Sequence, residues 1–245
     1  MNDRRYHRQI SVPELGAKGQ KTLHNSSIVV IGGGGLGSHI ADLLVRMGCG
    51  TLTIIDDDTV DLTNLHRTAL FTEKDIGQPK AYVLEQKLST INTASTITGI
   101  EERIDAQSIQ SFTKTADLLM DGTDNMHTRF LINDSAVKYR VPWVYTGVQS
   151  TVAMIMGIIP KQTPCLHCLT SVYHDTQEPL PILGMLPATA ASIACGEAMK
   201  LLLHQQPSGL IMYDIWNQQF DRLTVQRNTT CPCCAKDQFT SLKKE

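Results

Sequence analysis

The chain lacks the features that would take it into a membrane or onto a nucleic acid. No apolar run approaches the ~20 residues that a membrane-spanning helix needs, and residues 1–5 contain no apolar signal region. A formal net charge of −2 gives no electrostatic basis for binding nucleic acid. We therefore expect a cytoplasmic protein that binds neither nucleic acid nor membrane.

Charged residues are few, at 19% of the sequence, whereas apolar residues make up 42%. This balance is typical of a globular protein, and 245 residues suffice for one α/β domain with a substantial core. We therefore expect a single domain over residues 1–245.

The strongest local motif is a glycine run between a strand and a helix. Residues 28–31 are β-branched and predict a buried strand, and residues 38–47 carry apolar side chains at helical spacing. A strand that turns through glycines into a helix directs backbone N–H groups and the positive helix end at one point, which attracts phosphate. Gly32, Gly34 and Gly37 fit the pattern G-x-G-x-x-G, which predicts a nucleotide site.

A second strand, residues 51–55, ends at Asp56, where an acid can bond a ribose hydroxyl. Asn64, Arg67 and Lys80 then add polar and cationic groups. A hydride-transfer enzyme does not need these cations, but an enzyme that breaks a triphosphate does, because negative charge grows on the phosphoryl oxygens. For Lys80, an ordinary surface charge is an equally good interpretation.

A third buried strand, residues 117–121, leads to Asp124. A carboxylate just beyond a strand of an open parallel sheet lies in the ligand crevice. Mg²⁺ prefers one or two carboxylates together with phosphate oxygens, so Asp124 is a candidate magnesium ligand. The alternative, a helix N-cap, is compatible with that role.

Two Cys-x-x-Cys pairs predict a structural zinc site. Cys165 with Cys168, and Cys231 with Cys234, can each bind one side of a tetrahedral ion. A redox dithiol is the alternative, but the second pair is not followed by a helical pattern. We expect the other three cysteines and His167 not to bind the metal. Cys233 would be a spare thiol, and Cys49 and Cys195 would be small buried residues.

The order of elements predicts a Rossmann-like, doubly wound α/β fold whose mostly parallel sheet ends in antiparallel strands. A helical arm over residues 1–25 precedes the alternating elements. The expected strands are 28–31, 51–55, 96–100, 117–121, 142–146, 151–159, 211–214 and 220–225, with a helix at 188–204.

Together these pieces resemble the ThiF/MoeB/HesA adenylyltransferases, relatives of the ubiquitin-activating enzymes. The resemblance extends in family order from residue 5 to residue 234. The matching pieces are Arg5-Tyr6-His7-Arg8-Gln9-Ile10, the glycine loop, Asp56-x-Asp58-x-Val60, Thr63-Asn64-Leu65-x-Arg67, Gly77-Gln78-Pro79-Lys80, Asp121-x-Thr123-Asp124-Asn125 with Arg129, and the two cysteine pairs.

The resemblance implies a reaction in which the C-terminal glycine carboxylate of a small ubiquitin-like sulfur carrier, ending in Gly-Gly, attacks the α-phosphate of ATP and pyrophosphate leaves. It places Arg8 as an arginine finger in the partner protomer's site, which implies a functional homodimer. The implied nucleotide-binding residues are Gly32, Gly34, Gly35, Gly37, Asp56, Asp58, Asn64, Arg67, Lys80, Asp124 with Mg²⁺, and Asn125.

One family feature is missing. Residues 165–234 contain the zinc site and the crossover loop, but the crossover segment 169–191 has no cysteine. We therefore expect adenylation without a covalent carrier–enzyme intermediate, in thiamine or molybdenum cofactor biosynthesis. Three alternatives stay open: an enzyme that adenylates a peptide or RNA-nucleoside carboxylate, a non-catalytic nucleotide- or carrier-binding scaffold and, favoured least, a dehydrogenase.

Overall fold

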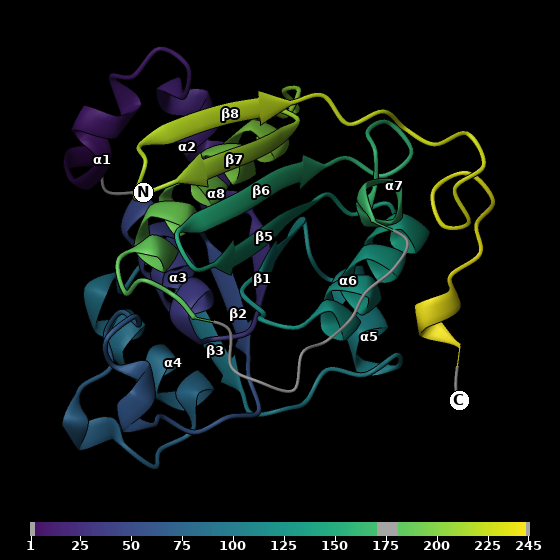
Figure 1. Cartoon of the computed structure of the whole chain (residues 1–245). Helices are drawn as coiled ribbons and strands as arrows, with labels where there is room; N and C mark the ends of the chain where they lie inside the picture. The colour runs from purple at the N-terminus through teal and green to yellow at the C-terminus, as the bar shows by residue number, and fades with distance from the viewer. Residues whose placement is uncertain (1–2, 171–180, 244–245) are drawn as a thin grey trace.

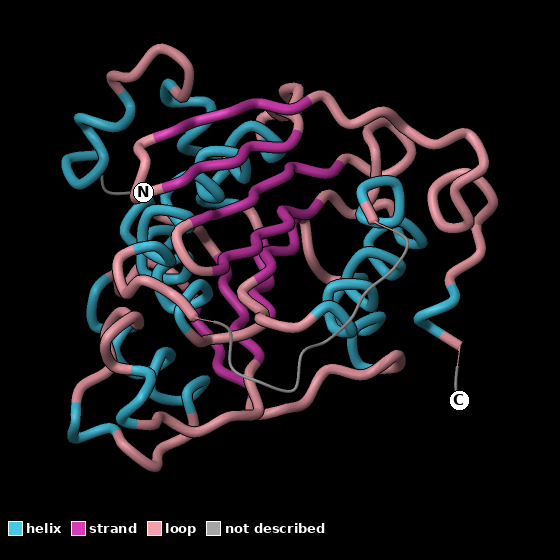
Figure 2. Tube along the Cα trace, viewed as in Figure 1, coloured by secondary structure: helices cyan, strands magenta, loops and turns pink. Residues whose placement is uncertain are grey.

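The computed structural model of the chain describes residues 3–170 and 181–243. An eight-stranded sheet, in the order β3-β2-β1-β4-β5-β6-β7-β8, has helices packed on both faces of its parallel part (Figures 1 and 2). The helices are α1 (Asp3–Ile10), α2 (Gly16–Asn25), α3 (Gly35–Met47), α4 (Lys80–Ile91), α5 (Ser108–Lys114), α6 (Met126–Tyr139), α7 (Leu166–Leu169) and α8 (Leu186–Leu202). The strands are β1 (Ser27–Ile31), β2 (Thr51–Ile55), β3 (Thr96–Ile100), β4 (Leu118–Asp121), β5 (Trp143–Gln149), β6 (Val152–Ile158), β7 (Leu210–Asp214) and β8 (Gln219–Leu223).

The predicted fold class is confirmed. Strands β1 to β5 pair in parallel, and β6, β7 and β8 follow in antiparallel order. Short turns join the antiparallel pairs β5–β6 and β7–β8, whereas α7 and α8 lie between β6 and β7. The parallel strands need the helical crossovers between them.

Element boundaries differ from the sequence predictions by a few residues. The helix expected from residue 38 already begins at Gly35, and the helix expected at 188–204 spans Leu186–Leu202 with Pro187 in its first turn. Proline is well tolerated there, because the first N–H groups of a helix have no partner within it. Residues 171–180 of the predicted crossover segment lie outside the described residues.

Two apolar clusters cover the two faces of the sheet. In β1, Ile28 and Val30 pack towards α3, α4 and α8, whereas Val29 and Ile31 pack towards α5 and α6. This alternation follows from the two-residue period of a strand. Strands covered on both faces read as continuous apolar runs, which is why residues 28–31 carry no polar side chain.

Helix α1 packs at the carboxyl ends of α3 and α4. Tyr6 is 4% exposed and packs on Gly48, and its hydroxyl accepts a hydrogen bond from Asn92 Nδ2 at 2.8 Å. Gln9 Nε2 donates to the carbonyl of Met47 at 3.0 Å. Arg5 donates to Asn92 Oδ1 at 2.5 Å, so this arginine fixes the arm to its own chain.

None of the described helices is long and apolar enough to cross a membrane.

Candidate nucleotide site and cysteine cluster

The glycine loop lies where the order of strands reverses. Strand β1 pairs with β2 on one side and with β4 on the other. The strands that follow β1 in the chain are therefore added first on one side of it and then on the other. In open α/β sheets a ligand binds beyond the carboxyl ends of the strands at this point. The turns after β1, β2 and β4 all meet there, as the sequence predicts.

Close backbone packing explains several of the glycines. Gly32 has a φ of +88°, which favours glycine, and its N–H donates to the carbonyl of Ile55 at 2.8 Å. A Cβ atom on Gly37 would lie 1.7 Å from the carbonyl oxygen of Gly32, and one on Gly122 would lie 2.5 Å from the same oxygen. These glycines allow β1, α3 and the turn after β4 to come together.

Gly34 has a different environment, because a Cβ atom there would meet nothing within 4 Å. It is the N-cap of α3 and has no side chain to accept a hydrogen bond from the first N–H groups of the helix. These donors and the helix dipole are therefore available to an anion.

Asp56 is held by the glycine loop itself. Its Oδ2 accepts a hydrogen bond from the N–H of Gly33 at 2.6 Å, and its Oδ1 accepts one from the N–H of Asp58 at 2.8 Å. Burial raises the pKa of the Asp56 carboxyl, partly offset by nearby Lys80 and by these two N–H groups. The carboxylate is thus fixed at the tip of β2, where a ribose hydroxyl would lie.

Lys80 is not an ordinary surface charge. It is 7% exposed, and its Nζ forms an ion pair with Asp58 Oδ2 at 2.8 Å. The backbone N–H of Lys80 also donates to the carbonyl of Asp58 at 2.9 Å, so two contacts hold the start of α4 against this loop.

Arg67 lies directly beside the glycine loop. A Cβ atom on Gly35 would lie 3.5 Å from Arg67 Cγ, and the guanidinium donates to the carbonyl of Thr63 at 2.7 Å. Asn64 contributes to a capping box, in which its Oδ1 accepts from the N–H of Asp61 at 3.3 Å. The amide NH₂ of Asn64 is therefore the group left to meet a phosphate.

The turn after β4 is shaped by a buried ion pair. Asp121 is 0% exposed and accepts from Arg129 Nε at 3.0 Å, while Arg129 Nη2 donates to the carbonyl of Thr123 at 2.7 Å. Burial lowers the pKa of Arg129, but the nearby carboxylate of Asp121 raises it, and the pKa of Arg129 lies above its ordinary value. This pair fixes the turn that presents Asp124.

The structure separates the two predicted roles of this turn. Asp124 is exposed and does not cap the helix, so the N-cap interpretation of this residue is wrong. The N-cap of α6 is Asn125, whose Oδ1 accepts from the N–H of Thr128 at 2.9 Å. Because the cap occupies this oxygen, a nucleotide would meet the other atoms of Asn125.

Arg8 lies far from the glycine loop of its own chain. It is exposed on α1, which packs against the Met47 end of α3, whereas the loop lies at the Gly35 end. A helix of this length spans about 20 Å. The structure therefore does not bring Arg8 together with the other predicted site residues of the same protomer.

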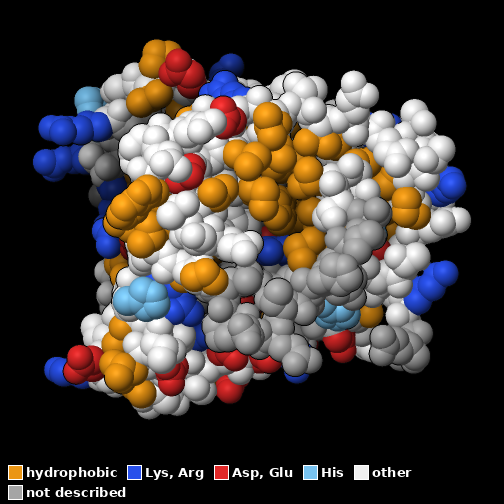
Figure 3. Space-filling model, in the orientation of Figure 1, with side chains coloured by type: hydrophobic (Ala, Val, Ile, Leu, Met, Phe, Trp, Pro, Cys, Tyr) orange, Lys and Arg blue, Asp and Glu red, His pale blue; other side chains and the backbone are white. Residues whose placement is uncertain are grey.

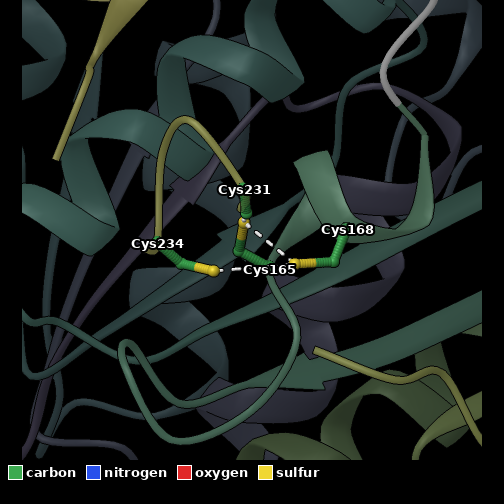
Figure 4. Close-up of side chains that lie close together, drawn as sticks. All are labelled: Cys165, Cys168, Cys231 and Cys234. Atoms are coloured by element: carbon green, nitrogen blue, oxygen red, sulfur yellow. Dashed lines mark hydrogen bonds between the residues drawn. The ribbon is translucent and has the colours of Figure 1, made fainter. Parts of the chain in front are cut away.

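The four predicted cysteine ligands converge from the segment around α7 and from the loop that follows β8 (Figure 4). Their sulfurs are 3.6 Å apart between Cys165 and Cys231, 3.6 Å between Cys168 and Cys234, and 4.0 Å between Cys165 and Cys168. Tetrahedral coordination with Zn–S bonds of about 2.3 Å requires sulfur separations of about 3.8 Å. The arrangement fits a zinc ion.

The other three cysteines are buried. Cys49 and Cys195 are 0% and 3% exposed, and burial raises the pKa of each thiol to about 12. The prediction that both are core residues is confirmed. Cys233 is also fully buried, and its Sγ accepts from Asn133 Nδ2 at 3.3 Å; as predicted, it is not among the four clustered cysteines.

A separate cavity of about 690 Å³ lies at the carboxyl end of α6. Lys138, Arg140 and Lys161 line it together with apolar side chains. None of the predicted site residues borders it, so it is not part of the nucleotide site.

The geometry agrees with the comparison to known sequences. A model of the ThiF family matches residues 6–233. The chain belongs to the ThiF family. Several of its relatives are named as adenylyltransferases of sulfur carrier proteins.

The sulfur carrier protein adenylyltransferase of Thermus thermophilus is 33% identical, covering 95% of this chain and 91% of the relative. The sulfur carrier protein ThiS adenylyltransferase of Escherichia coli is 34% identical, over 96% and 97%. The molybdopterin-synthase adenylyltransferase of Salmonella typhimurium is 31% identical, over 95% and 96%. The fold is shared with the crystal structure of E. coli MccB with ATP, which superposes with a TM-score of 0.84 at 22% identity, over 95% of this chain and 75% of that one.

Two glycine substitutions separate packing from ligand access. We expect Gly37→Ala to destabilise the protein by more than about 3 kcal/mol, because the added methyl overlaps a backbone carbonyl that cannot move aside. We expect the control Gly34→Ala to cost much less stability but to weaken ATP binding, because its methyl faces open space where phosphate approaches. Denaturant unfolding and nucleotide titration measure the two effects; a Gly37→Ala protein as stable as wild type would contradict this account of the loop.

Proposed function

We propose that this protein is an ATP-dependent adenylyltransferase that activates the C-terminal glycine carboxylate of a small ubiquitin-like sulfur carrier for thiamine or molybdenum cofactor biosynthesis. The observation that carries the proposal is the meeting of the glycine loop, Asp56, Arg67 and Lys80 at one crevice of a ThiF-family chain. The names of the relatives supply the substrate class.

The chemistry needs positioning and charge stabilisation rather than a general base. The carrier carboxylate is already an anion; one of its oxygens bonds to the α-phosphorus of ATP, and the bond to the bridging oxygen of pyrophosphate breaks. The protein's task is to align these groups and to stabilise the charge that moves onto pyrophosphate.

The two cations are placed for that task. Arg67 donates to a neutral carbonyl, that of Thr63, which a phosphate oxygen would replace with a stronger, charge-assisted bond. Lys80 is buried beside Asp58 and the fixed carboxylate of Asp56, at the place where the nucleotide would lie. Asp124, exposed in the adjacent turn, would hold Mg²⁺, which adds positive charge to the triphosphate when bound.

The carrier would dock on the sheet face that α8 does not cover. Figure 3 shows apolar side chains gathered over β6, β7 and β8. The strand register places Met154, Met212 and Leu223 on this face, and Leu223 is 46% exposed. An apolar patch at the surface is typical of a protein-binding site.

The active form would be a homodimer in which Arg8 enters the partner's site. Tyr6, Gln9 and Asn92 fix α1 about 20 Å from the glycine loop of its own chain, a distance set by the length of α3. Arg8 can therefore meet a triphosphate only on another protomer.

The cysteine cluster would hold one structural Zn²⁺ per chain. The ion would link the loop after β8 to the segment around α7, two parts of the chain that are distant in sequence. Because such binding is coupled to folding, the metal stabilises the carboxyl-terminal region without taking part in adenylation.

Pyrophosphate exchange tests the enzymatic proposal. We expect the protein with ATP, Mg²⁺ and its Gly-Gly carrier to exchange labelled pyrophosphate into ATP, and Arg67→Ala to lower the rate by about 10²-fold, since one donor to the developing charge is lost. Arg46→Ala is the matched control, because Arg46 pairs with Asp42 on the exposed side of α3. Absence of exchange with every Gly-Gly carrier of the source genome would contradict the proposal.

Mixed dimers test the position of Arg8. Arg8→Ala and Lys80→Ala chains should each be impaired, and their mixture should regain activity because one hybrid site contains both intact residues. A mixture of Lys80→Ala and Arg67→Ala chains is the control: both residues belong to the same protomer's site, so no hybrid site is intact. A verified Arg8/Lys80 heterodimer without activity would show that Arg8 does not act in trans.

The state of the cysteines predicts the absence of a covalent carrier intermediate. Non-reducing electrophoresis and mass spectrometry during turnover should show no carrier–enzyme adduct, because Cys49 and Cys195 are buried with raised pKa values. Cys195→Ala should retain pyrophosphate exchange. A thioester or acyl disulfide on Cys195 would overturn this expectation.

A further inference from the structure

The interior of helix α6 contains three fully buried polar residues, of which two carry an amide and a carboxylate. Asn133 and Asp134 are both 0% exposed. Such side chains are rarely buried, and neither favours a helix interior. A buried polar group is costly unless it is hydrogen-bonded, so the partners of these two residues indicate their purpose.

Asn133 contacts both cysteine-bearing segments. Its Oδ1 accepts a hydrogen bond from the N–H of Leu166, the residue after Cys165, at 2.8 Å. Its Nδ2 donates to the Sγ of Cys233, which lies between Cys231 and Cys234, at 3.3 Å. One amide thus bridges the two Cys-x-x-Cys pairs.

Asp134 makes a parallel set of contacts. Its Oδ1 pairs with His167 Nε2 at 2.9 Å, and His167 stands between Cys165 and Cys168. Its Oδ2 accepts from the N–H of Ser241 at 3.0 Å, which holds the segment that follows the second pair. His167 is thereby oriented by a carboxylate, while its ring packs 4.5 Å from that of Phe130.

We propose that Asn133 and Asp134 are positioning residues that hold the two cysteine pairs in the arrangement that zinc requires. The inference rests on the proposed zinc site. Neither pair is placed by a long regular element: α7 spans only Leu166–Leu169, and the second pair lies in a loop. A rigid helix that bonds to both segments supplies the order that they lack.

If Asn133 and Asp134 hold the cysteine pairs in place, the protein releases zinc more slowly than it would without them. Groups that orient metal ligands from outside the coordination sphere change metal affinity by about 10–100-fold when they are altered. Without Asn133, the N–H of Leu166 and the thiol of Cys233 lose their common partner, and the two pairs can separate when a metal–sulfur bond opens.

The test compares two buried asparagines. Asn133→Leu keeps the shape of the side chain and removes its hydrogen bonds. Asn92→Leu is the matched control, because Asn92 is 1% exposed and donates to Tyr6 Oη at 2.8 Å and to the carbonyl of Val45 at 2.9 Å, and it contacts none of the four cysteines of the cluster. Zinc release to a chromogenic chelator is followed well below the unfolding temperature of each protein.

We expect Asn133→Leu to release zinc about 10–100-fold faster than wild type. Asn92→Leu should lower the unfolding temperature and leave zinc release unchanged. Equal release rates for Asn133→Leu and wild type, or equal acceleration by Asn92→Leu, would overturn the inference. Elemental analysis of wild type separates the two proposals: a wild-type protein without zinc contradicts the zinc site itself.

A milder pair of variants serves where Asn133→Leu does not fold. His167→Leu removes the imidazole that pairs with Asp134, whereas His167→Gln retains an N–H donor. We expect faster zinc release from His167→Leu and near wild-type release from His167→Gln. If the two variants release zinc at the same rate, the hydrogen bond to Asp134 does not position the cysteine pairs.

Discussion

The structure depends on the close approach of three backbone segments at the end of β1. The carbonyl of Gly32 lies so near Gly37 and Gly122 that neither position can carry a side chain. This contact brings the first turn of α3 and the turn after β4 to the same crevice. A larger residue at either position would separate the phosphate-binding helix end from the carboxylate turn, and the site would not form.

Helix α6 connects this crevice to the cysteine cluster. Its N-cap, Asn125, follows Asp124 directly, and one turn further Arg129 is fixed by buried Asp121. Two turns along, Asn133 bonds to both cysteine-bearing segments. A single rigid helix therefore carries the charged turn at one end and the attachment of the carboxyl-terminal region in its middle, so the order of each region depends on the same element.

The sequence predicts those features that a local pattern determines. Strands 28–31 and 51–55, the glycine loop and both cysteine pairs follow from periodicity and spacing, and the structure shows them in place. The sequence alone does not reveal interactions between residues that are distant along the chain. Nothing in the sequence around Asn133 indicates that this residue is buried against Cys233, and the capping role of Asn125 rather than Asp124 depends on where α6 begins.

The arrangement suits a reaction whose nucleophile arrives already charged. The groups at this end of the sheet are backbone donors, the cations Arg67 and Lys80, and carboxylates such as Asp56. Asp56 is held by Gly33 of the glycine loop, Lys80 by Asp58 and Arg67 by the carbonyl of Thr63. Among the described residues no thiol lies with them: Cys195 is buried in the core, where burial raises the pKa of its thiol to about 12. A site of this composition suits formation of an acyl-adenylate but offers no thiolate to take over the acyl group. On the mechanism we propose, the sulfur nucleophile that consumes the adenylate would come from outside this site, which would have to stay accessible to it after pyrophosphate has left.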